Sequence, residues 1–266
     1  MSSELRLQVI GGGKMGEALI GGLLADGWAR GDEVAVLEKL PERRSELAAR
    51  FPELVLIDAP VDGVDALLAV KPQDVDSVGA SLGAAGVRRL LSIAAGVTTA
   101  RLEALVGGGV AVVRAMPNTP ALVGQGAAAI AGGAAADDGD LEWARGILSS
   151  VGLVVALDEA QLDAVTGLSG SGPAYVFLVA EALVAGGIAV GLDPAVADAL
   201  TRQTLLGAAR LLAETGEDPA VLRANVTSPG GTTAEGLAAL DAAGVRAAFA
   251  QAVRAATERS VELGRS

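Results

Sequence analysis

Short apolar runs alternate with helix-forming stretches over about the first 158 residues of the chain. Apolar runs of about four to eight residues between turn-forming residues are typical of buried strands, and their alternation with helical stretches indicates a mostly parallel, doubly wound sheet. The pattern therefore predicts an α/β domain, with a helix at about residues 136–150 between its last two strands. The expected strands lie at residues 5–10, 33–37, 54–57, 66–70, 90–93, 110–114, 124–131 and 151–157.

The pattern changes at about residue 159, where long helical stretches take over. Residues 174–191 are apolar on almost every face, and Pro173 suits the first helical position because its missing N–H costs nothing there. A second helix is expected at residues 195–214, opened by Asp193-Pro194. Two helices with such wide apolar faces predict a tight helical dimer interface. A membrane span is disfavoured by Glu181 and the Gly186-Gly187 pair.

A glycine-rich turn follows the first expected strand and reads Gly11-Gly12-Gly13-Lys14-Met15-Gly16. Gly11 permits a sharp turn, Gly13 lets the backbone approach a pyrophosphate, and Gly16 lets the following helix pack close to the strand. The helix start would present unpaired N–H groups and a partial positive charge to the phosphates. The turn therefore predicts a dinucleotide-binding Rossmann-type domain over residues 1–158. The alternative is an ordinary glycine-rich turn.

The residues after the second strand bear on the choice of cofactor. Glu38 lies 22 residues beyond Gly16, where an acidic residue normally accepts hydrogen bonds from the adenosine ribose and disfavours a 2′-phosphate. Arg43 and Arg44 follow, and they could turn back onto a 2′-phosphate or simply form a solvated helix face. The sequence therefore leaves the choice between NAD and NADP open.

Other strand ends should line the same crevice, because ligands of open α/β sheets lie at the carboxyl ends of the strands. Val70, Lys71 and Pro72 end the fourth strand, and Pro72 marks its edge. Ala95 belongs to a run of small residues directly after the fifth strand, and their size leaves room for a nicotinamide ring. Asn118 stands between two prolines, where its amide could bond the nicotinamide or substrate or only close a turn.

The second informative stretch is residues 226–237. Pro229-Gly230-Gly231 forces a turn, and Thr232 with Glu235 three residues later predicts a capping box that starts a helix. Hydroxyl and N–H groups around Ser228 and Thr233 would converge on this helix start, which favours a small carboxylate. The alternative is a plain capped turn. A last amphipathic helix is expected at residues 245–263.

Composition removes several classes of function. The net charge of −12 argues against nucleic acid or an anionic membrane as a partner. The chain has no cysteine, which excludes disulfides and thiolate chemistry, and no histidine, which removes the commonest general base and metal ligand. We therefore expect no metal site and a mechanism without imidazole. The first residues lack the features of a signal peptide, which suggests a cytoplasmic protein.

Five stretches together carry a family pattern that covers essentially the whole chain. They read GGGKMG at residues 11–16, AVKP at 69–72, RAMPNTP at 114–120, LSGSGPAY at 168–175 and VTSPGGTT at 226–233. In this order they resemble the Δ1-pyrroline-5-carboxylate reductase family, which catalyses the last step of proline biosynthesis. The resemblance implies a Rossmann N-terminal domain, an all-helical domain at residues 159–266 for dimerisation and substrate, and often a ring of dimers.

The resemblance also implies roles for individual residues. The substrate carboxylate would lie on the amides of Gly230, Gly231, Thr232 and Thr233, across the dimer interface from the nicotinamide. Thr233 would hydrogen-bond the ring nitrogen, and Glu159 would lie near the substrate. Family members often favour NADPH, but Glu38 departs from the small polar residue common at that position.

The implied reaction is hydride transfer from C4 of NAD(P)H to C5 of the cyclic imine, giving L-proline. A protonated imine is already electrophilic, so the enzyme has mainly to position two reactants, which can contribute about 7–11 kcal/mol, and solvent can deliver the proton. A 3-hydroxyacid dehydrogenase is the first alternative, but its lysine base is missing from the helical half: the lysines are Lys14, Lys39 and Lys71. The second is a non-catalytic nucleotide-sensing protein, against which the intact stretch 228–233 argues.

Overall fold

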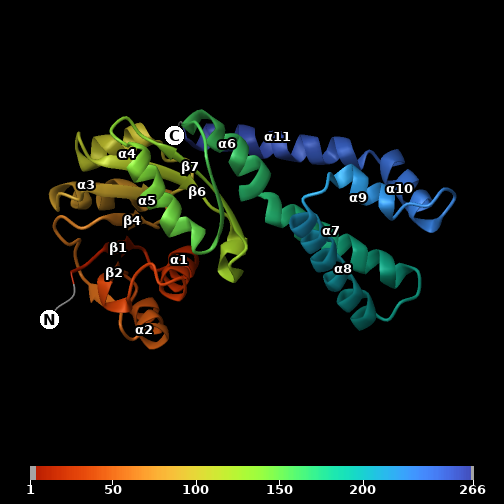
Figure 1. The fold of residues 1–266 in the computed structure, drawn as a ribbon, viewed down its shortest axis with the longest axis horizontal. Coiled ribbons are helices and arrows are strands. Elements are labelled where there is room, and N and C mark those ends of the chain that lie inside the picture. The colour runs from red at the N-terminus through yellow and green to blue at the C-terminus, as the bar shows by residue number, and fades with distance from the viewer. Residues whose placement is uncertain (1–3, 265–266) are drawn as a thin grey trace. The chain divides into compact units, whose positions relative to one another are not determined.

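The computed structural model describes residues 4–264, and its first part is built on one eight-stranded sheet (Figure 1). The strand order is β3-β2-β1-β4-β5-β6-β7-β8, and neighbouring strands are parallel except for β6 and β7. The expected doubly wound α/β fold is therefore confirmed. The strands are β1 (Leu7–Ile10), β2 (Val34–Leu37), β3 (Val55–Ile57), β4 (Ala66–Leu68), β5 (Arg89–Ser92), β6 (Ala111–Met116), β7 (Gly126–Gly132) and β8 (Gly152–Ala156).

The strand order reverses beside β1, which pairs with β2 on one side and with β4 on the other. Gln8 stands opposite Ala35 of β2 and Ala66 of β4, so the central strands are in fixed register. In doubly wound sheets the crevice at such a reversal, outside the carboxyl ends of the strands, is where ligands bind. The segments that follow β1 and β4 therefore flank the expected binding crevice.

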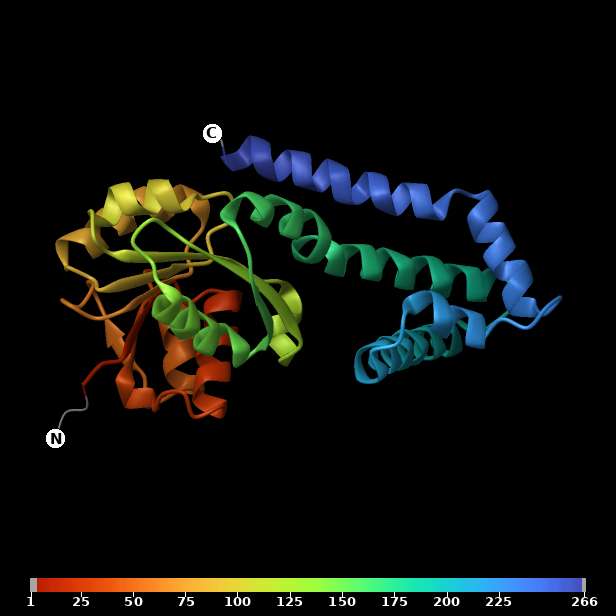
Figure 2. The same cartoon turned by 45° about the horizontal axis from the view of Figure 1, so that its top comes forward.

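Helices cover both faces of the sheet, as Figures 1 and 2 show. Leu7 and Val9 point to one face and pack with α1 (Lys14–Ala25), whereas Ile10 belongs to the core of the opposite face. This division follows from the two-residue side-chain period of a strand. The first face also carries α2 (Pro41–Arg50) and α5 (Asp138–Ser149), and the second carries α3 (Val75–Ala84) and α4 (Thr99–Val106).

The remainder of the described chain is helical. Its contacts divide the described residues into two compact units: residues 4–171 with 254–264, and residues 172–253. The domain boundary expected at residue 158 stays a prediction, because compactness alone does not define a substrate domain. The helices are α6 (Leu162–Val165), α7 (Gly172–Ala189), α8 (Pro194–Thr215), α9 (Pro219–Asn225), α10 (Thr232–Ala242) and α11 (Val245–Gly264).

The sequence analysis did not anticipate helix α9. Asp218 precedes Pro219, and its carboxylate accepts a hydrogen bond from Ala220 N at 2.7 Å. The same arrangement opens α8, where Asp193 accepts from Ala195 N at 2.9 Å. An acidic N-cap followed by proline is therefore the signal that would have predicted α9.

Residues 159–189 form a helical run that is long and apolar enough, by length and composition alone, to cross a membrane. In the described chain its apolar side chains lie open, for example Phe177, which is 61% exposed, and Leu178, which is 65% exposed. A helix of this kind is stable in water only when its apolar face is covered.

Candidate active site

The glycine turn after β1 has the geometry that its sequence predicts. Gly11 has a φ of 104°, and a Cβ atom there would lie 2.6 Å from Ala69 O in the segment after β4. A Cβ atom at Gly16 would lie 2.2 Å from Gly11 O, so α1 packs directly on the turn. Gly13 has no heavy atom within 4 Å of such a position and therefore faces open space. These three environments fit a turn, a close packing contact and an approach to a ligand.

The start of α1 is open to an anion. Gly13 is its N-cap and supplies no side-chain cap, and its carbonyl accepts from Glu17 N at 2.8 Å. The N–H groups of Lys14, Met15 and Gly16 precede that first intrahelical bond and carry the positive end of the helix dipole. This helix start fits the diphosphate of a dinucleotide, since no side chain caps its N–H groups.

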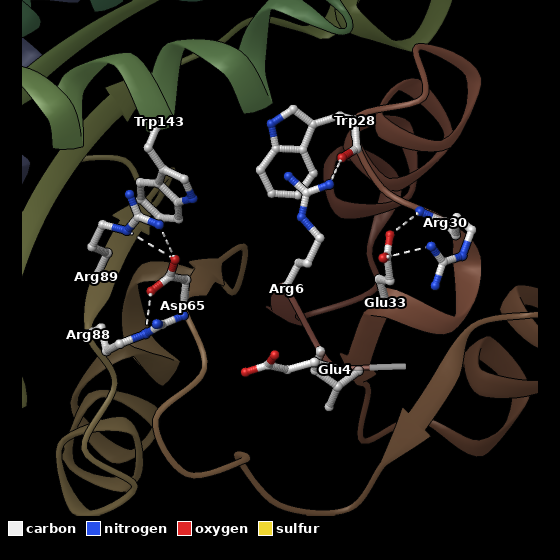
Figure 3. A pocket seen from close by; sticks show the side chains of 10 residues that line it. Glu4, Arg6, Trp28, Arg30, Glu33, Asp65, Arg88, Arg89 and Trp143 are labelled. Carbon is white, nitrogen blue, oxygen red and sulfur yellow. Dashed lines mark hydrogen bonds and ion pairs between the residues drawn. The ribbon is translucent and has the colours of Figure 1, made fainter. Parts of the chain in front are cut away.

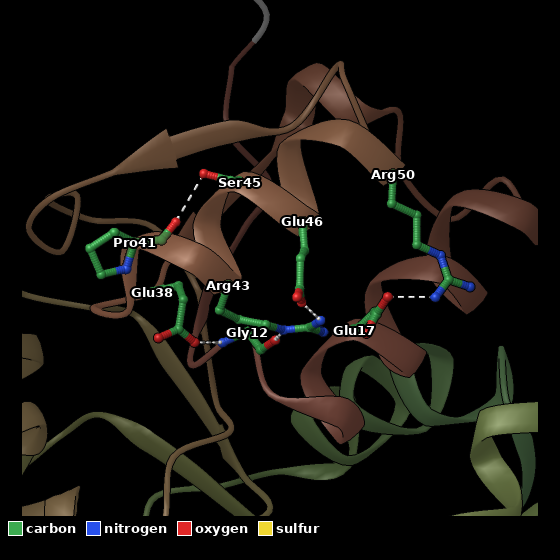
Figure 4. Close-up of polar contacts among 8 residues, drawn as sticks. All are labelled: Gly12, Glu17, Glu38, Pro41, Arg43, Ser45, Glu46 and Arg50. Atoms are coloured by element: carbon green, nitrogen blue, oxygen red, sulfur yellow. Dashed lines mark hydrogen bonds and ion pairs between the residues drawn. The ribbon is translucent and has the colours of Figure 1, made fainter.

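Two charged residues hold Gly12 from opposite sides (Figure 4). Gly12 N donates to Glu38 Oε2 at 2.9 Å, and Leu40 N donates to Glu38 Oε1 at 2.9 Å. Arg43 Nε donates to Gly12 O at 2.6 Å. The glycine turn is thereby fastened to the connection between β2 and α2, and Glu38, which is 9% exposed, is buried in that contact.

Arg43 is also tied to α1 and to its own helix. It pairs with Glu17 and, at 2.7 Å, with Glu46, while Arg50 binds the other oxygen of Glu17. Burial raises the pKa of Glu17, but the hydrogen bonds from Arg43 and Arg50 outweigh burial and hold that pKa below its usual value. Arg44 donates to Ile57 O at 2.8 Å and pairs with Asp58 at 2.9 Å.

The other predicted cofactor residues lie at the same edge of the sheet. Val70 is next to Gly11, because a Cβ atom at Gly11 would be 3.1 Å from Val70 Cγ1. Lys71 and Pro72 are exposed on the loop that leads into α3, and Ala95 is exposed on the loop after β5. The structure thus brings Gly11 and Val70 together and leaves the other three open to solvent.

Asn118 uses its amide within the protein. Its Nδ2 donates to Ser169 O at 3.0 Å, and its Oδ1 accepts from Ala127 N at 2.8 Å. These bonds join the segment after β6 to β7 and to the turn before α7, which agrees with the turn-closing interpretation. An asparagine amide can make about four hydrogen bonds, so a contact with the nicotinamide or substrate stays a prediction.

Glu159 joins the start of α4 to β6. Its Oε1 accepts from Thr99 N at 2.7 Å and from Arg114 Nη1 at 3.1 Å, and its Oε2 accepts from Thr99 Oγ1 at 2.6 Å. Burial raises the pKa of Glu159, but the hydrogen bonds from Thr99 and Arg114 outweigh burial and hold that pKa below its usual value. Sequence reasoning gave Thr99 and Arg114 no role, because contacts between residues 45 and 60 positions apart leave no local signal.

The second predicted site begins with a tight turn before α10. Gly231 N donates to Ser228 O at 3.0 Å, and Gly230 has a φ of 68°, a conformation that favours glycine. A Cβ atom at position 231 would lie 2.4 Å from Ser228 Oγ, so only glycine allows that hydroxyl its place. The backbone conformation therefore favours glycine at position 230, and a side chain at position 231 would displace the Ser228 hydroxyl.

Helix α10 begins where expected, but the predicted capping box between Thr232 and Glu235 is wrong. Gly231 is the N-cap, and no side chain caps the helix. Thr232 is already the first helical residue, so its hydroxyl is past the position from which it could cap, and Glu235 N donates to Gly231 O at 3.2 Å. The N–H groups at the start of α10 are consequently left for another acceptor.

The two predicted sites lie in different compact units, the glycine turn in the first and the α10 turn in the second. Within residues 4–264 no group of three or more acidic side chains is placed to hold a metal ion. A further hollow of about 450 Å³ lies at the amino ends of β1 and β5, at the opposite edge of the sheet from the glycine turn, and is lined by the two tryptophans (Figure 3).

Both the first part of the chain and the helical remainder match models of known protein families. Residues 159–263 match the model described as pyrroline-5-carboxylate reductase dimerisation, and residues 6–96 match NADP oxidoreductase coenzyme F420-dependent. The chain is 47% identical to a pyrroline-5-carboxylate reductase of a Synechocystis species, covering 98% of this chain and 99% of the relative. The chain belongs to the pyrroline-5-carboxylate reductase family. Another reductase, from Pseudomonas aeruginosa, is 42% identical over 98% of this chain and 97% of its own length.

Solved structures of reductases agree with this assignment. A pyrroline-5-carboxylate reductase from Coxiella burnetii has a TM-score of 0.90 at 34% identity, covering 98% of this chain and 99% of that one. The Plasmodium falciparum pyrroline carboxylate reductase, solved with NADP bound, has a TM-score of 0.83 at 28% identity, covering 99% of both chains. A prephenate dehydrogenase shares the fold alone, at 13% identity and a TM-score of 0.53.

The predicted activity is therefore confirmed at the level of the family. The chain is an NAD(P)H-dependent oxidoreductase of proline biosynthesis, and neither the 3-hydroxyacid dehydrogenase nor the nucleotide-sensing alternative is favoured. The matched dimerisation model confirms that pyrroline-5-carboxylate reductases of this kind form oligomers, and it spans the exposed apolar helix α7.

Proposed function

We propose that the reductase reaction uses the glycine turn of one subunit and the α10 turn of its dimer partner. The observation that carries this proposal is the uncapped start of α10, which presents N–H groups beside Gly230 and Gly231 without any side-chain acceptor. A helix start of this kind favours a carboxylate, and the family substrate has one. The remaining support is the family's assignment of these residues to the substrate.

The cofactor would be held along the carboxyl edge of the sheet. Gly11, Gly13 and Gly16 shape the turn, and the N–H groups of Lys14 and Met15 lie at the start of α1, where the diphosphate fits. Glu38 lies at the adenosine end, and Ala95 lies on the loop after β5 at the nicotinamide end. Val70, Lys71, Pro72 and Asn118 complete the proposed cofactor residues.

The substrate would bind through its carboxylate to the amides of Gly230, Gly231, Thr232 and Thr233, with Ser228 holding the turn closed. Thr233 would hydrogen-bond the ring nitrogen and steady the amine as it forms. When bound, the reduced nicotinamide supplies the hydride that the imine carbon accepts. The protein's own contribution is to orient the two reactants, and solvent supplies the proton at nitrogen, which suits a chain without histidine.

Glu159 is proposed near the substrate, and its contacts define how it would act there. Its carboxylate holds Thr99 at the start of α4, immediately after the loop that carries Ala95. Arg114 neutralises its charge at 3.1 Å. Glu159 would therefore position the nicotinamide-side loop as well as border the substrate.

The assembly and location are proposed from the same family membership. We propose a homodimer through the apolar faces of α7 and α8, with a ring of dimers as the larger assembly, in the cytoplasm. The net charge of −12 favours neither nucleic acid nor an anionic membrane as a partner.

One assay tests the proposed function. The purified protein is mixed with NADH or NADPH, and nicotinamide absorbance is followed with Δ1-pyrroline-5-carboxylate, with no second substrate, and with 3-hydroxyisobutyrate and the oxidised cofactor. Oxidation that depends on the imine supports the proposal. Turnover with the hydroxyacid alone would favour the dehydrogenase, and cofactor binding without any turnover would favour the sensor.

A further inference from the structure

A hollow of about 410 Å³ lies at the carboxyl ends of β2 and β3. Glu38 and Lys39 line it from the end of β2, Ile57 and Asp58 line it from the end of β3, and Arg44 lines it from α2. Glu38 connects this hollow to the glycine turn, because it holds Gly12 N at 2.9 Å. The hollow is thus next to the place where the proposed diphosphate site begins.

We propose that this hollow receives the adenosine ribose of the cofactor and that Glu38 makes this chain select NADH over NADPH. The inference rests on the proposed use of the glycine turn and adds the identity of the cofactor. The Plasmodium falciparum relative was solved with NADP bound, so the selection belongs to the residues of this chain and not to the fold.

The state of Glu38 is the first argument. Its two oxygens each accept one backbone N–H, from Gly12 and from Leu40, both at 2.9 Å. Among the ion pairs within residues 4–264, none involves Glu38, so backbone N–H groups alone balance its charge. Each carboxylate oxygen can accept more than one hydrogen bond, so both retain capacity for a ribose hydroxyl. A 2′-phosphate has no proton to donate when fully ionised and would repel this carboxylate.

The cations near the hollow are the second argument, because a 2′-phosphate needs a surplus of positive charge. Arg43 is committed to Gly12 O, Glu17 and Glu46, and therefore holds the turn and α1 together (Figure 4). Removing it from those contacts would release the same turn that has to bind the diphosphate.

Arg44 and Lys39 are the two cations that line the hollow, and each already has an acidic partner. Arg44 pairs with Asp58 at 2.9 Å, and Lys39 pairs with Asp74 at 3.0 Å. Together with Glu38, these acids leave the surroundings without excess positive charge. A dianionic phosphate would therefore enter a neutral hollow beside a buried carboxylate, whereas a ribose hydroxyl would meet a ready acceptor.

The test measures affinity, so that it does not depend on turnover. Dissociation constants of NADH and NADPH for the purified full-length protein are determined by titration calorimetry, and those of 5′-AMP and 2′,5′-ADP are determined in the same way. We expect NADH to bind at least fivefold more tightly than NADPH, and 5′-AMP at least fivefold more tightly than 2′,5′-ADP. A smaller difference, or a preference for the ligands that carry a 2′-phosphate, would overturn the proposal that this chain selects NADH.

The variant Glu38→Gln removes the charge and keeps the size of the side chain. It also loses one acceptor for a backbone N–H, but damage to the turn weakens both dinucleotides alike, so the ratio of the two affinities isolates the effect of the charge. The ratio should move at least fivefold toward NADPH. An unchanged ratio in a variant that still binds NADH would show that Glu38 does not determine the choice between NADH and NADPH.

The matched control is Glu42→Gln, which removes the same charge from an exposed position in the first turn of α2. Its ratio should stay within twofold of the wild-type ratio, and a shift as large as that of Glu38→Gln would overturn the assignment to Glu38. If neither dinucleotide binds the wild-type protein, the proposed function fails as well. If both bind equally well, only the selection fails.

Discussion

Single side chains fix the local geometry of both proposed sites. At the glycine turn, Glu38 and Arg43 hold the N–H and the carbonyl of Gly12. At the α10 turn, a Cβ atom at Gly231 would lie 2.4 Å from Ser228 Oγ and would displace that hydroxyl. Glu38 and Arg43 hold the first turn through their side chains, whereas the backbone carbonyl of Ser228 closes the second, and both helix starts are left without a side-chain cap. The N–H groups that a ligand needs are thereby kept free of side chains from the same turn.

The first prediction concerns Thr233. Thr233→Ala should lower turnover about tenfold, because it removes one hydrogen bond to the ring nitrogen of the substrate. The affinity for the reduced cofactor should stay nearly unchanged. Steady-state kinetics and calorimetric titration with NADH measure the two effects separately. Thr215→Ala, at the exposed end of α8, is the matched control and should change neither. Loss of cofactor affinity with normal turnover of the bound cofactor would assign Thr233 to the opposite end of the site.

The second prediction concerns pH and Glu159. Its pKa is lower in the folded protein than in the unfolded chain, so its contribution to stability is complete above the unfolded value of about 4.5 and is lost as the pH falls through the folded value. Glu159→Gln should cost about 2 kcal/mol near neutral pH and flatten the acid limb of the stability curve. Urea unfolding between pH 3 and 7 checks this. An acid limb as steep as that of the wild type would show that Glu159 does not stabilise the fold through its charge.

At the scale of elements, the sequence predicted regular structure well and long-range contacts poorly. All eight expected strands are present, because each apolar run was bounded by turn-forming residues. Gln8 shows the limit: it is buried in the middle of β1, and its amide bonds Val61 and Val64 in the β3–β4 connection. No local sequence pattern predicts a hydrogen-bond partner so far away along the chain. The contacts of Asn118 and Glu159 were missed for the same reason.

The third prediction belongs to the amino edge of the sheet (Figure 3). Asp65 precedes β4, is 2% exposed and binds Arg89 Nε at 3.0 Å, while Arg89 stacks on Trp143 at 4.6 Å. Asp65→Asn should destabilise the first unit by about 3 kcal/mol, because it leaves a guanidinium without its buried counter-charge. Tryptophan fluorescence during urea unfolding measures this directly, since Trp28 and Trp143 both lie in that unit.

Asp62→Asn is the control for that experiment, because Asp62 is exposed in the same connection. It should change the free energy of unfolding by less than about 0.5 kcal/mol. Equal effects of the two substitutions would mean that charge at this edge, and not the buried pair, decides stability.

At the scale of the whole molecule, the apolar helices indicate what the single chain lacks. Phe177, Leu178 and Leu183 are each about half exposed or more on α7, and Leu200 and Leu206 are similarly open on α8. The family model that spans them is one for dimerisation. The interface through α7 and α8 that the sequence predicts would cover these side chains, and it stays a prediction.

The fourth prediction tests that interface. Phe177→Glu places a charge on the apolar face of α7 and should shift the protein to a monomer that has lost most of its activity, because a carboxylate buried in an apolar interface is strongly unfavourable. Sedimentation velocity gives the assembly state. Ala80→Glu, at an exposed position on α3, is the control and should leave assembly unchanged. A Phe177→Glu protein that sediments like the wild type would remove α7 from the interface.

The end of α11 belongs to the first compact unit, where Ser260 Oγ donates to Asp163 Oδ1 at 2.6 Å and Gly264 lies against Gly96. Residues 172–253 are thus an insertion within that unit and not an appendage to it. During synthesis the nucleotide-binding half therefore lacks the end of α11 until residues 172–253 have been made. A chain cut anywhere within residues 172–253 would therefore deprive the nucleotide-binding half, and not only the helical one, of a segment that packs in it.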